Sequence, residues 1–223
     1  MKKLAIAAAA LLAGASMPAA AQTYSLSGDF GNPVFQYGTV TTANGVNSFN
    51  AFGQSNCNDI GVSGLCYRGG DKFQVEFQRN ADSVLVHPGP GDGENSFLLF
   101  TAPKTGVYTY DVTVTRGDSG DGVNLFTFNS FDGTKPMIAT VNAGSPNYVF
   151  QYSQLLTAGQ QVGLGIDRGG PGNTYFNDST LFSGTISGAV PEPATWALMI
   201  VGFGAVGGAM RRRSAVRTNV SFA

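Results

Sequence analysis

Short hydrophobic runs, several of them alternating with polar residues, recur along the chain from residue 22 to residue 188. The clearest run is Val107 to Arg116, where every second residue from Tyr108 to Val114 is hydrophobic and the residues between them are threonine or aspartate. Because side chains alternate between the two faces of a strand, this pattern predicts a strand with one face in the core and the other in water. Further strands are predicted at Phe73–Phe77, Ser83–Val86, Phe97–Thr101, Val123–Phe128, Met137–Val141, Tyr148–Leu156, Gln161–Ile166 and Leu181–Ser187.

Turn-forming residues separate these runs, with Gly, Pro, Asp and Asn gathered at 88–93, 117–122 and 167–173. Many short strands with frequent turns are typical of an all-β fold. The sequence therefore predicts one two-sheet β-sandwich, jelly-roll-like in topology, over residues 22–188. Residues 41–70 are rich in Asn, Gly and Ser, and we expect long loops there.

Composition narrows the class of protein further. Gly accounts for 31 of the 223 residues and only 12% are charged, which excludes coiled coils and long helical bundles. A hydrophobic fraction of 43% excludes a fully disordered chain. Between Gln22 and Val190, seven basic residues stand against thirteen acidic ones, a net charge of −6. A body of this charge is not expected to bind nucleic acid or anionic lipid.

The N-terminus has the features of a secretory signal peptide. Lys2 and Lys3 precede an apolar run from Leu4 to Ala15, and the small residues Ala19 to Ala21 follow. This order predicts a signal peptide over residues 1–21 that signal peptidase removes before Gln22.

The C-terminus holds a second apolar segment. An uncharged stretch from Ala194 to Met210 would form a helix of about 26 Å, just long enough to approach the thickness of a bilayer. Basic residues that follow such a stretch stay on the cytoplasmic side, so residues 214–223 are expected to be a cytoplasmic tail. The residues that define this segment are Pro191, Glu192, Pro193, Trp196, Ala197, Arg211, Arg212 and Arg213.

This C-terminal arrangement resembles the PEP-CTERM sorting signal in its PEPxxWA variant, over residues 189–213. The resemblance implies export, transient insertion of the precursor in the inner membrane through the C-terminal helix, and processing by an exosortase near Pro191. It also implies a Gram-negative bacterium that makes exopolysaccharide, and a protein that ends at the cell surface or outside the cell.

The body carries a second resemblance, on motifs that are structural in character. The strings are His87-Pro88-Gly89, Phe97-Leu98-Leu99-Phe100-Thr101-Ala102-Pro103, Thr105-Gly106-Val107-Tyr108-Thr109-Tyr110 and Tyr175-Phe176-Asn177-Asp178-Ser179-Thr180. Together they resemble secreted PEP-CTERM proteins whose body is a jelly-roll sandwich similar to carbohydrate-binding modules. The resemblance implies the same fold here.

Few residues suggest catalysis or a tightly bound metal. Cys57 and Cys66 are the only cysteines, and in an exported protein such a pair is expected to form a disulfide. His87 is the single histidine and lies beside turn residues, where a structural role is expected. Glu76 is the carboxylate that a glycan-cleaving enzyme would use, but strand alternation favours an exposed polar face for it. No GxSxG, HExxH or Walker-type motif occurs.

Acidic turns provide the oxygen atoms that Ca²⁺ prefers, although none has the spacing of an EF-hand. The candidate calcium ligands are Asp118, Asp121 and Asp178. Asp-Gly is also common turn chemistry, so a purely structural role is the alternative.

Loop residues with aromatic, amide or guanidinium groups are candidates for binding sugar rings and hydroxyls. They are Arg168, Asn173, Tyr175 and Asn177. We therefore expect a non-enzymatic surface or matrix protein that associates with exopolysaccharide or another glycan. The alternatives are a purely structural or protein-binding matrix component and, less favoured, a glycan-active enzyme.

Overall fold

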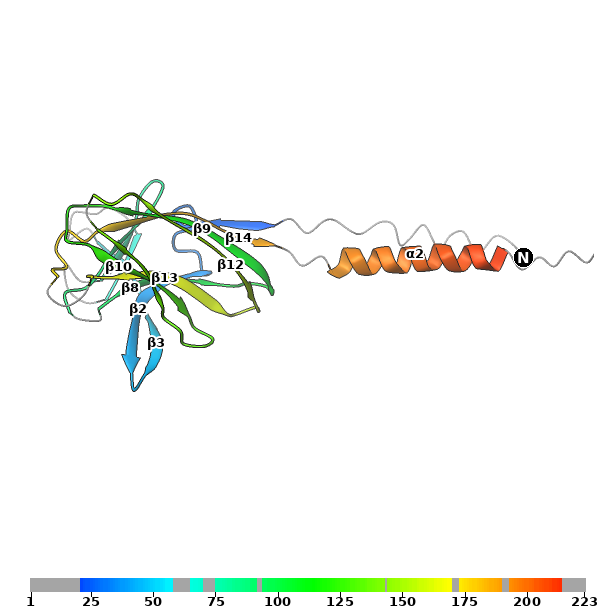
Figure 1. Ribbon diagram of the computed structural model, residues 1–223, viewed down its shortest axis with the longest axis horizontal. Helices are drawn as coiled ribbons and strands as arrows, with labels where there is room; N and C mark the ends of the chain where they lie inside the picture. Colours follow the sequence, from blue (N-terminus) through cyan, green and yellow to red (C-terminus); the bar gives the residue numbers. More distant parts are fainter. Residues whose placement is uncertain are drawn as a thin grey trace, which may run out of the picture. The chain divides into compact units, whose positions relative to one another are not determined.

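Two antiparallel β-sheets pack face to face in the part of the chain from residue 21 to residue 189 (Figure 1). The computed structural model describes residues 21–57, 65–69, 75–91, 94–142, 144–169, 173–189 and 193–213. The strand partners of both sheets lie within 22–189, as does the hydrophobic core. These residues therefore form one compact unit with its own core, and its jelly-roll-like β-sandwich is the fold class that the sequence predicts.

The first sheet, sheet A, is the larger. Its order is β12 (Tyr148–Leu156), β9 (Gly106–Arg116), β14 (Thr180–Ala189), β7 (Val84–His87), β6 (Glu76–Arg79), β5 (Leu65–Arg68) and β4 (Gln54–Asn56), and β1 (Gln22–Ser25) also pairs with β14. Sheet B has the order β11 (Met137–Val141), β10 (Val123–Asn129), β13 (Gln161–Asp167), β8 (Ser96–Thr101), β2 (Phe35–Ala43) and β3 (Val46–Ala51).

The predicted alternation in Val107–Arg116 is confirmed in β9. Tyr108, Tyr110 and the two valines that follow on the same face are buried, whereas Val107, Thr109 and Asp111 are exposed. The buried residues of β9 face those of sheet B, among them Leu98 and Phe100 from β8. Alternation along each strand thus builds a core between the sheets, and the burial of large apolar side chains drives this packing.

Sheet B also has a smaller cluster on its other face. Phe97 and Leu99 point away from the main core and are nevertheless fully buried, together with Val40 and Phe128. They fit because β13 has Gly163 beside Leu99 and Gly165 beside Phe97, where a Cβ atom would collide with these side chains. The Lys135 ammonium lies 5.3 Å from the centre of the Phe126 ring at the border of this cluster.

The expectation of long loops over residues 41–70 is wrong for much of that segment. β2 and β3 form a hairpin in which Ala43 pairs with Val46. Asn44 and Gly45 make its two-residue turn with φ angles of 52° and 78°. Asn-Gly is the strongest short-range signal for such a turn, because both central residues must adopt positive φ.

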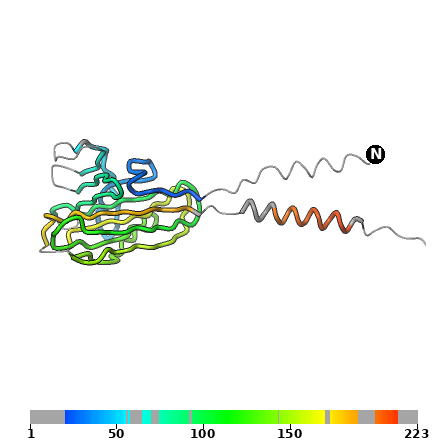
Figure 2. The backbone as a smooth tube through the Cα atoms, turned by 90° about the horizontal axis from the view of Figure 1, so that it is seen from above, coloured from blue at the N-terminus to red at the C-terminus, as the bar shows by residue number. Residues whose placement is uncertain are grey.

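The two ends of the sandwich chain are neighbours. β1 and β14 pair in antiparallel register, with Gln22 opposite Gly188. Figure 2 shows the blue β1 beside the orange β14. The first strand of the sandwich therefore begins beside the end of its last strand.

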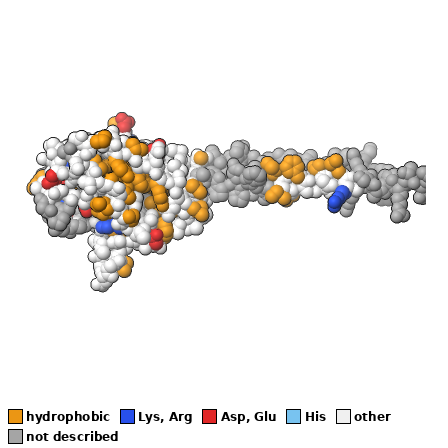
Figure 3. All heavy atoms as spheres, viewed as in Figure 1, with side chains coloured by type: hydrophobic (Ala, Val, Ile, Leu, Met, Phe, Trp, Pro, Cys, Tyr) orange, Lys and Arg blue, Asp and Glu red, His pale blue; other side chains and the backbone are white. Residues whose placement is uncertain are grey.

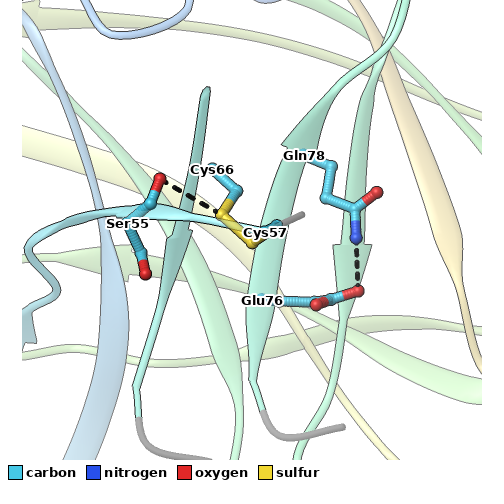
Figure 4. Close-up of a disulfide and its surroundings, with 5 residues drawn as sticks. All are labelled: Ser55, Cys57, Cys66, Glu76 and Gln78. Atoms are coloured by element: carbon cyan, nitrogen blue, oxygen red, sulfur yellow. Dashed lines mark hydrogen bonds between the residues drawn. A yellow bond between two sulfur atoms is a disulfide. The ribbon is translucent and has the colours of Figure 1, made fainter. Parts of the chain in front are cut away.

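A disulfide joins Cys57 to Cys66, with 6.2 Å between their Cα atoms (Figure 4). Cys66 lies on β5 and its sulfur is 3.5 Å from the Ser55 carbonyl oxygen on β4. The bond thus fastens the short strand at one edge of sheet A, and both cysteines are fully buried.

The C-terminal segment contains the helix α2, Pro193–Arg213. Its apolar side chains from Met199 to Met210 are exposed, and so is Arg211. Pro191 and Glu192 lie outside the described residues, as do residues 1–20 and 214–223. The sequence led us to expect a membrane-crossing helix here, but within the described residues no helix combines the length and apolarity that crossing a membrane requires.

Candidate functional site

A cavity of about 380 Å³ opens at one end of sheet A. The residues that line it are Glu76, His87, Asp118, Tyr175, Phe176, Asn177 and Ser179. A volume of this size is typical of small-molecule sites.

Neighbouring strand ends bring these residues together. β6 begins with Glu76 and β7 ends with His87, and these two residues are directly opposite each other in the sheet. Asp118 follows the end of β9, and residues 173–179 lead into Thr180 at the start of β14. Thr180 pairs with both Arg116 and Val86, so loops distant in sequence meet at one sheet end.

Two aromatic rings form one wall of the cavity. The ring centres of Tyr175 and Phe176 are 4.3 Å apart and the rings are inclined by 31°. Tyr175 also meets the His87 imidazole edge to face, with 6.1 Å between the ring centres. Phe176 is 61% exposed although it is large and apolar. A solvent-facing aromatic surface beside polar groups is a feature of ligand sites.

A buried ion pair holds the loop that carries these rings. Arg116 Nη2 donates to Asp178 Oδ1 at 2.9 Å and to the Asn177 carbonyl at 3.0 Å. The Gly122 N–H donates to the same carboxylate oxygen at 3.4 Å. The Asp178 side chain is fully buried and that of Arg116 is 6% exposed. Burial raises the pKa of the Asp178 carboxyl, and the bond from Arg116 opposes this increase.

The backbone at Asn177 has an uncommon conformation. Its φ is 59°, in the left-handed region that Asn tolerates better than most residues. The Gly120 N–H donates to the Asn177 carbonyl at 2.7 Å, and a Cβ atom at Gly120 would collide with that oxygen. The close approach of these two loops fixes the position of Asn177 at the cavity.

His87 is oriented by a hydrogen bond. Its Nδ1 lies 2.7 Å from the Pro88 carbonyl oxygen, and since a carbonyl only accepts, Nδ1 is the donor. Burial lowers the pKa of His87, and the charge of Arg116 lowers it further, whereas the Pro88 carbonyl and Asp118 oppose the decrease. Burial therefore favours the neutral form of the imidazole over the charged form.

Glu76 is not on an exposed face, which corrects the sequence-based expectation. Its carboxylate is half-buried, lines the cavity, and accepts a hydrogen bond of 2.7 Å from Gln78 Nε2 (Figure 4). Gln78 is only 7% exposed. The alternation of β6 is right, but Glu76 lines a cavity together with residues from distant parts of the chain, which the pattern of one strand cannot reveal.

Only two of the predicted ligand-binding residues, Tyr175 and Asn177, line the cavity. Arg168 Nη1 donates to the Pro90 carbonyl at 2.7 Å, and neither Arg168 nor Asn173 is among the lining residues. Phe176 was missed as a site residue. Its position beside Tyr175 in a turn rich in Asn and Gly was the signal that could have identified it.

The three predicted calcium ligands bind protein groups. Asp118 lies 3.7 Å from Arg116 Nη2 and accepts from the Ser179 N–H at 3.3 Å, and Asp121 accepts from the Thr174 N–H at 3.0 Å. Across the described ranges, no three His, Cys, Asp or Glu side chains are grouped so that they could hold a metal ion. The calcium site therefore rests on the sequence alone.

Comparison with known families identifies the C-terminal segment. Residues 189–213 match the model of the PEP-CTERM protein-sorting motif. The chain therefore carries an exosortase-dependent sorting signal, which directs its export to the cell envelope. No curated protein matches the chain.

Among solved structures, the sandwich is similar to family 29 carbohydrate-binding modules. One variant of such a module is 11% identical, with 75% of this chain and 92% of that chain covered and a TM-score of 0.36. A second structure of the family is 13% identical, with 72% and 97% covered and a TM-score of 0.35. A third, described as complexed with mannohexaose, is 13% identical, with 69% and 92% covered and a TM-score of 0.34.

Proposed function

We propose that this exported protein binds a glycan in the cavity at the end of sheet A and catalyses no reaction there. The observation that carries the proposal is the aromatic wall formed by half-buried Tyr175 and exposed Phe176, beside hydrogen-bonding groups in one cavity. A sugar ring has an apolar face that packs on an aromatic ring and hydroxyls that need polar partners.

The polar groups suit the hydroxyls of a sugar. The carboxylates of Glu76 and Asp118 accept hydrogen bonds from hydroxyl groups, and Asn177 can both donate and accept. Within the described residues, the lining includes no Lys or Arg. Because the lining carries two carboxylates, we expect a neutral glycan to bind better than a uronic acid polymer.

Titration calorimetry on residues 22–189 tests this function, with exopolysaccharide purified from the source strain. We expect saturable heat with the natural sequence. The Phe176→Ala variant should bind about fivefold more weakly, since a stacked ring contributes on the order of 1 kcal/mol. The matched control is Phe131→Ala, an exposed aromatic residue that does not line the cavity.

The outcomes separate the alternatives. Absence of saturable heat would favour a structural or protein-binding role and would contradict glycan binding. Release of reducing ends during incubation, lost in a Glu76→Gln variant, would instead identify a glycan-active enzyme.

We also propose that the precursor is held at the inner membrane before exosortase processing. The exposed apolar side chains of α2 support this, including Ile200 and Phe203 at 70% and 72% exposure. Deletion of residues 190–223 should move the protein from the membrane fraction to the periplasm. An unchanged distribution would contradict the proposal.

A further inference from the structure

We propose that the free edge of β12 pairs with β12 of a second copy of this chain, so that sheet A continues from one molecule into the next. β12 is the last strand of sheet A, and among the described strands only β9 pairs with it. Its other edge has backbone N–H and C=O groups that can accept a further strand. This inference is independent of glycan binding, because β12 contributes no residue to the cavity.

The sequence of β12 lacks the features that protect sheet edges. Over its nine residues, YVFQYSQLL, it has no charged residue and no Pro. Soluble proteins usually block such edges with charges, Pro, bulges or very short strands. The other described edge strands are shorter, with six residues in β3, five in β11, four in β1 and three in β4.

The outward-facing residues of β12 are complementary to those of a second copy that runs antiparallel to it. With Tyr152 opposite its own copy, all nine residues overlap, and Val149 lies opposite Leu155 of the second copy. Gln151 then lies opposite Ser153 of the second copy. These two pairs on the outward face match apolar with apolar and polar with polar, whereas on the core-facing side Phe150 lies opposite Gln154. Both members of each pair point to the same face of the joined sheet.

The apolar residues of this edge are exposed in the single chain. Val149 is 56% exposed and Leu155 is 66% exposed, and Leu155 is paired with Val107 of β9, which is 43% exposed. Figure 3 shows hydrophobic side chains gathered on the face of the sandwich where Figure 1 labels β10 and β13 of sheet B. Pairing through β12 would bring Val149 of one copy against the Leu155 and Val107 surface of the other.

Sedimentation velocity of residues 22–189 tests the pairing through two matched double variants. Gln151 and Ser153 are both exposed, so their replacement spares the core. In the first variant, Gln151→Lys with Ser153→Lys, each introduced lysine faces another across the interface. In the second, Gln151→Lys with Ser153→Glu, each lysine faces a glutamate. Like charges directly opposite destabilise a strand pair, and opposite charges stabilise it.

We expect the unmodified domain to dimerise with rising concentration. The double-lysine variant should dimerise about tenfold more weakly, and the lysine-glutamate variant should dimerise at least as well as the unmodified domain. A monomer at every concentration would overturn the proposal. A dimer with equal affinity in both variants would also overturn it, because the strands would then not meet in this register.

Discussion

Arg116 Nη2 lies 2.9 Å from Asp178 Oδ1 in a contact that is almost entirely removed from solvent. Arg116 is the last residue of β9, and Asp178 lies two residues before β14 begins. The pair therefore joins a rigid strand end to the loop that carries Tyr175, Phe176 and Asn177. The position of this loop at the cavity therefore depends on the Arg116–Asp178 pair, although neither residue lines the cavity.

Replacement of Asp178 tests the structural contribution of this pair. Asp178→Ala leaves the buried Arg116 charge with only the more distant Asp118 carboxylate, at 3.7 Å. We expect the free energy of unfolding to fall by about 3 kcal/mol. Urea unfolding followed by circular dichroism measures the loss. Asp82→Ala, at an exposed aspartate, is the control and should change stability by less than about 0.5 kcal/mol. Equal losses in both variants would show that the buried pair has no special contribution.

Because His87 is the single histidine, its contribution to the pH dependence of stability can be followed by itself. The pKa of His87 is lower in the folded protein than its ordinary value, so the unfolded chain binds a proton more readily. We expect the contribution of His87 to stability to be complete above about pH 6.5 and to be lost as the pH falls through its folded pKa. The raised pKa of Asp178 acts in the opposite direction, with a contribution that is lost as pH rises.

The two effects are separated by comparing the natural protein with His87→Gln. Unfolding free energies between pH 5 and pH 7.5 should decline on acidification more steeply in the natural protein than in the variant. Nuclear magnetic resonance of the single imidazole gives its pKa directly. A value above the ordinary range would contradict the burial of this side chain.

Replacement of Gly163 tests the packing of the smaller cluster on sheet B, which contains Phe97 and Leu99. A Cβ atom there would collide with the Leu98 carbonyl and lie 2.8 Å from Leu99 Cδ1. We expect Gly163→Ala to lower the melting temperature, with a cost of about 1 to 3 kcal/mol for overpacking. At Gly53 a Cβ atom meets nothing within 4 Å, so Gly53→Ala should be neutral. Similar melting temperatures for both variants would contradict the close contact.

The disulfide should stabilise the edge of sheet A. Simultaneous Cys57→Ala and Cys66→Ala replacement is expected to reduce the free energy of unfolding by about 2 to 3 kcal/mol, because the bond restricts the unfolded chain. Urea unfolding with and without a reductant measures this effect. The reductant should weaken the natural protein to the level of the variant and leave the variant itself unchanged.

Sequence periodicity predicted the strands that have one buried and one exposed face. Tyr148–Leu156 and Met137–Val141 have the predicted boundaries, and β9 begins one residue earlier than predicted. The N-terminal strands were missed because their signal is different. β3 is largely polar and exposed, and the Asn44-Gly45 turn rather than alternation identifies its hairpin.

The candidate site was harder to predict, because it forms where loops distant in sequence converge. Nothing in the sequence next to Glu76 or His87 shows that these two residues share a cavity with the segment 175–179. Asp178 looked like a surface ligand for calcium, but the residue that determines its environment, Arg116, is 62 positions away in the chain. Such pairings depend on strand order, which alternation within single strands does not specify.

The position of β14 has a mechanical consequence. Its ten residues begin beside the cavity and end where the sorting segment leaves the sandwich, and β9 pairs with it along this whole length. A pull between a bound ligand and an anchored C-terminus would therefore act along the axis of β14. Since the ladder hydrogen bonds lie across that axis, they would be loaded together in shear rather than broken one at a time.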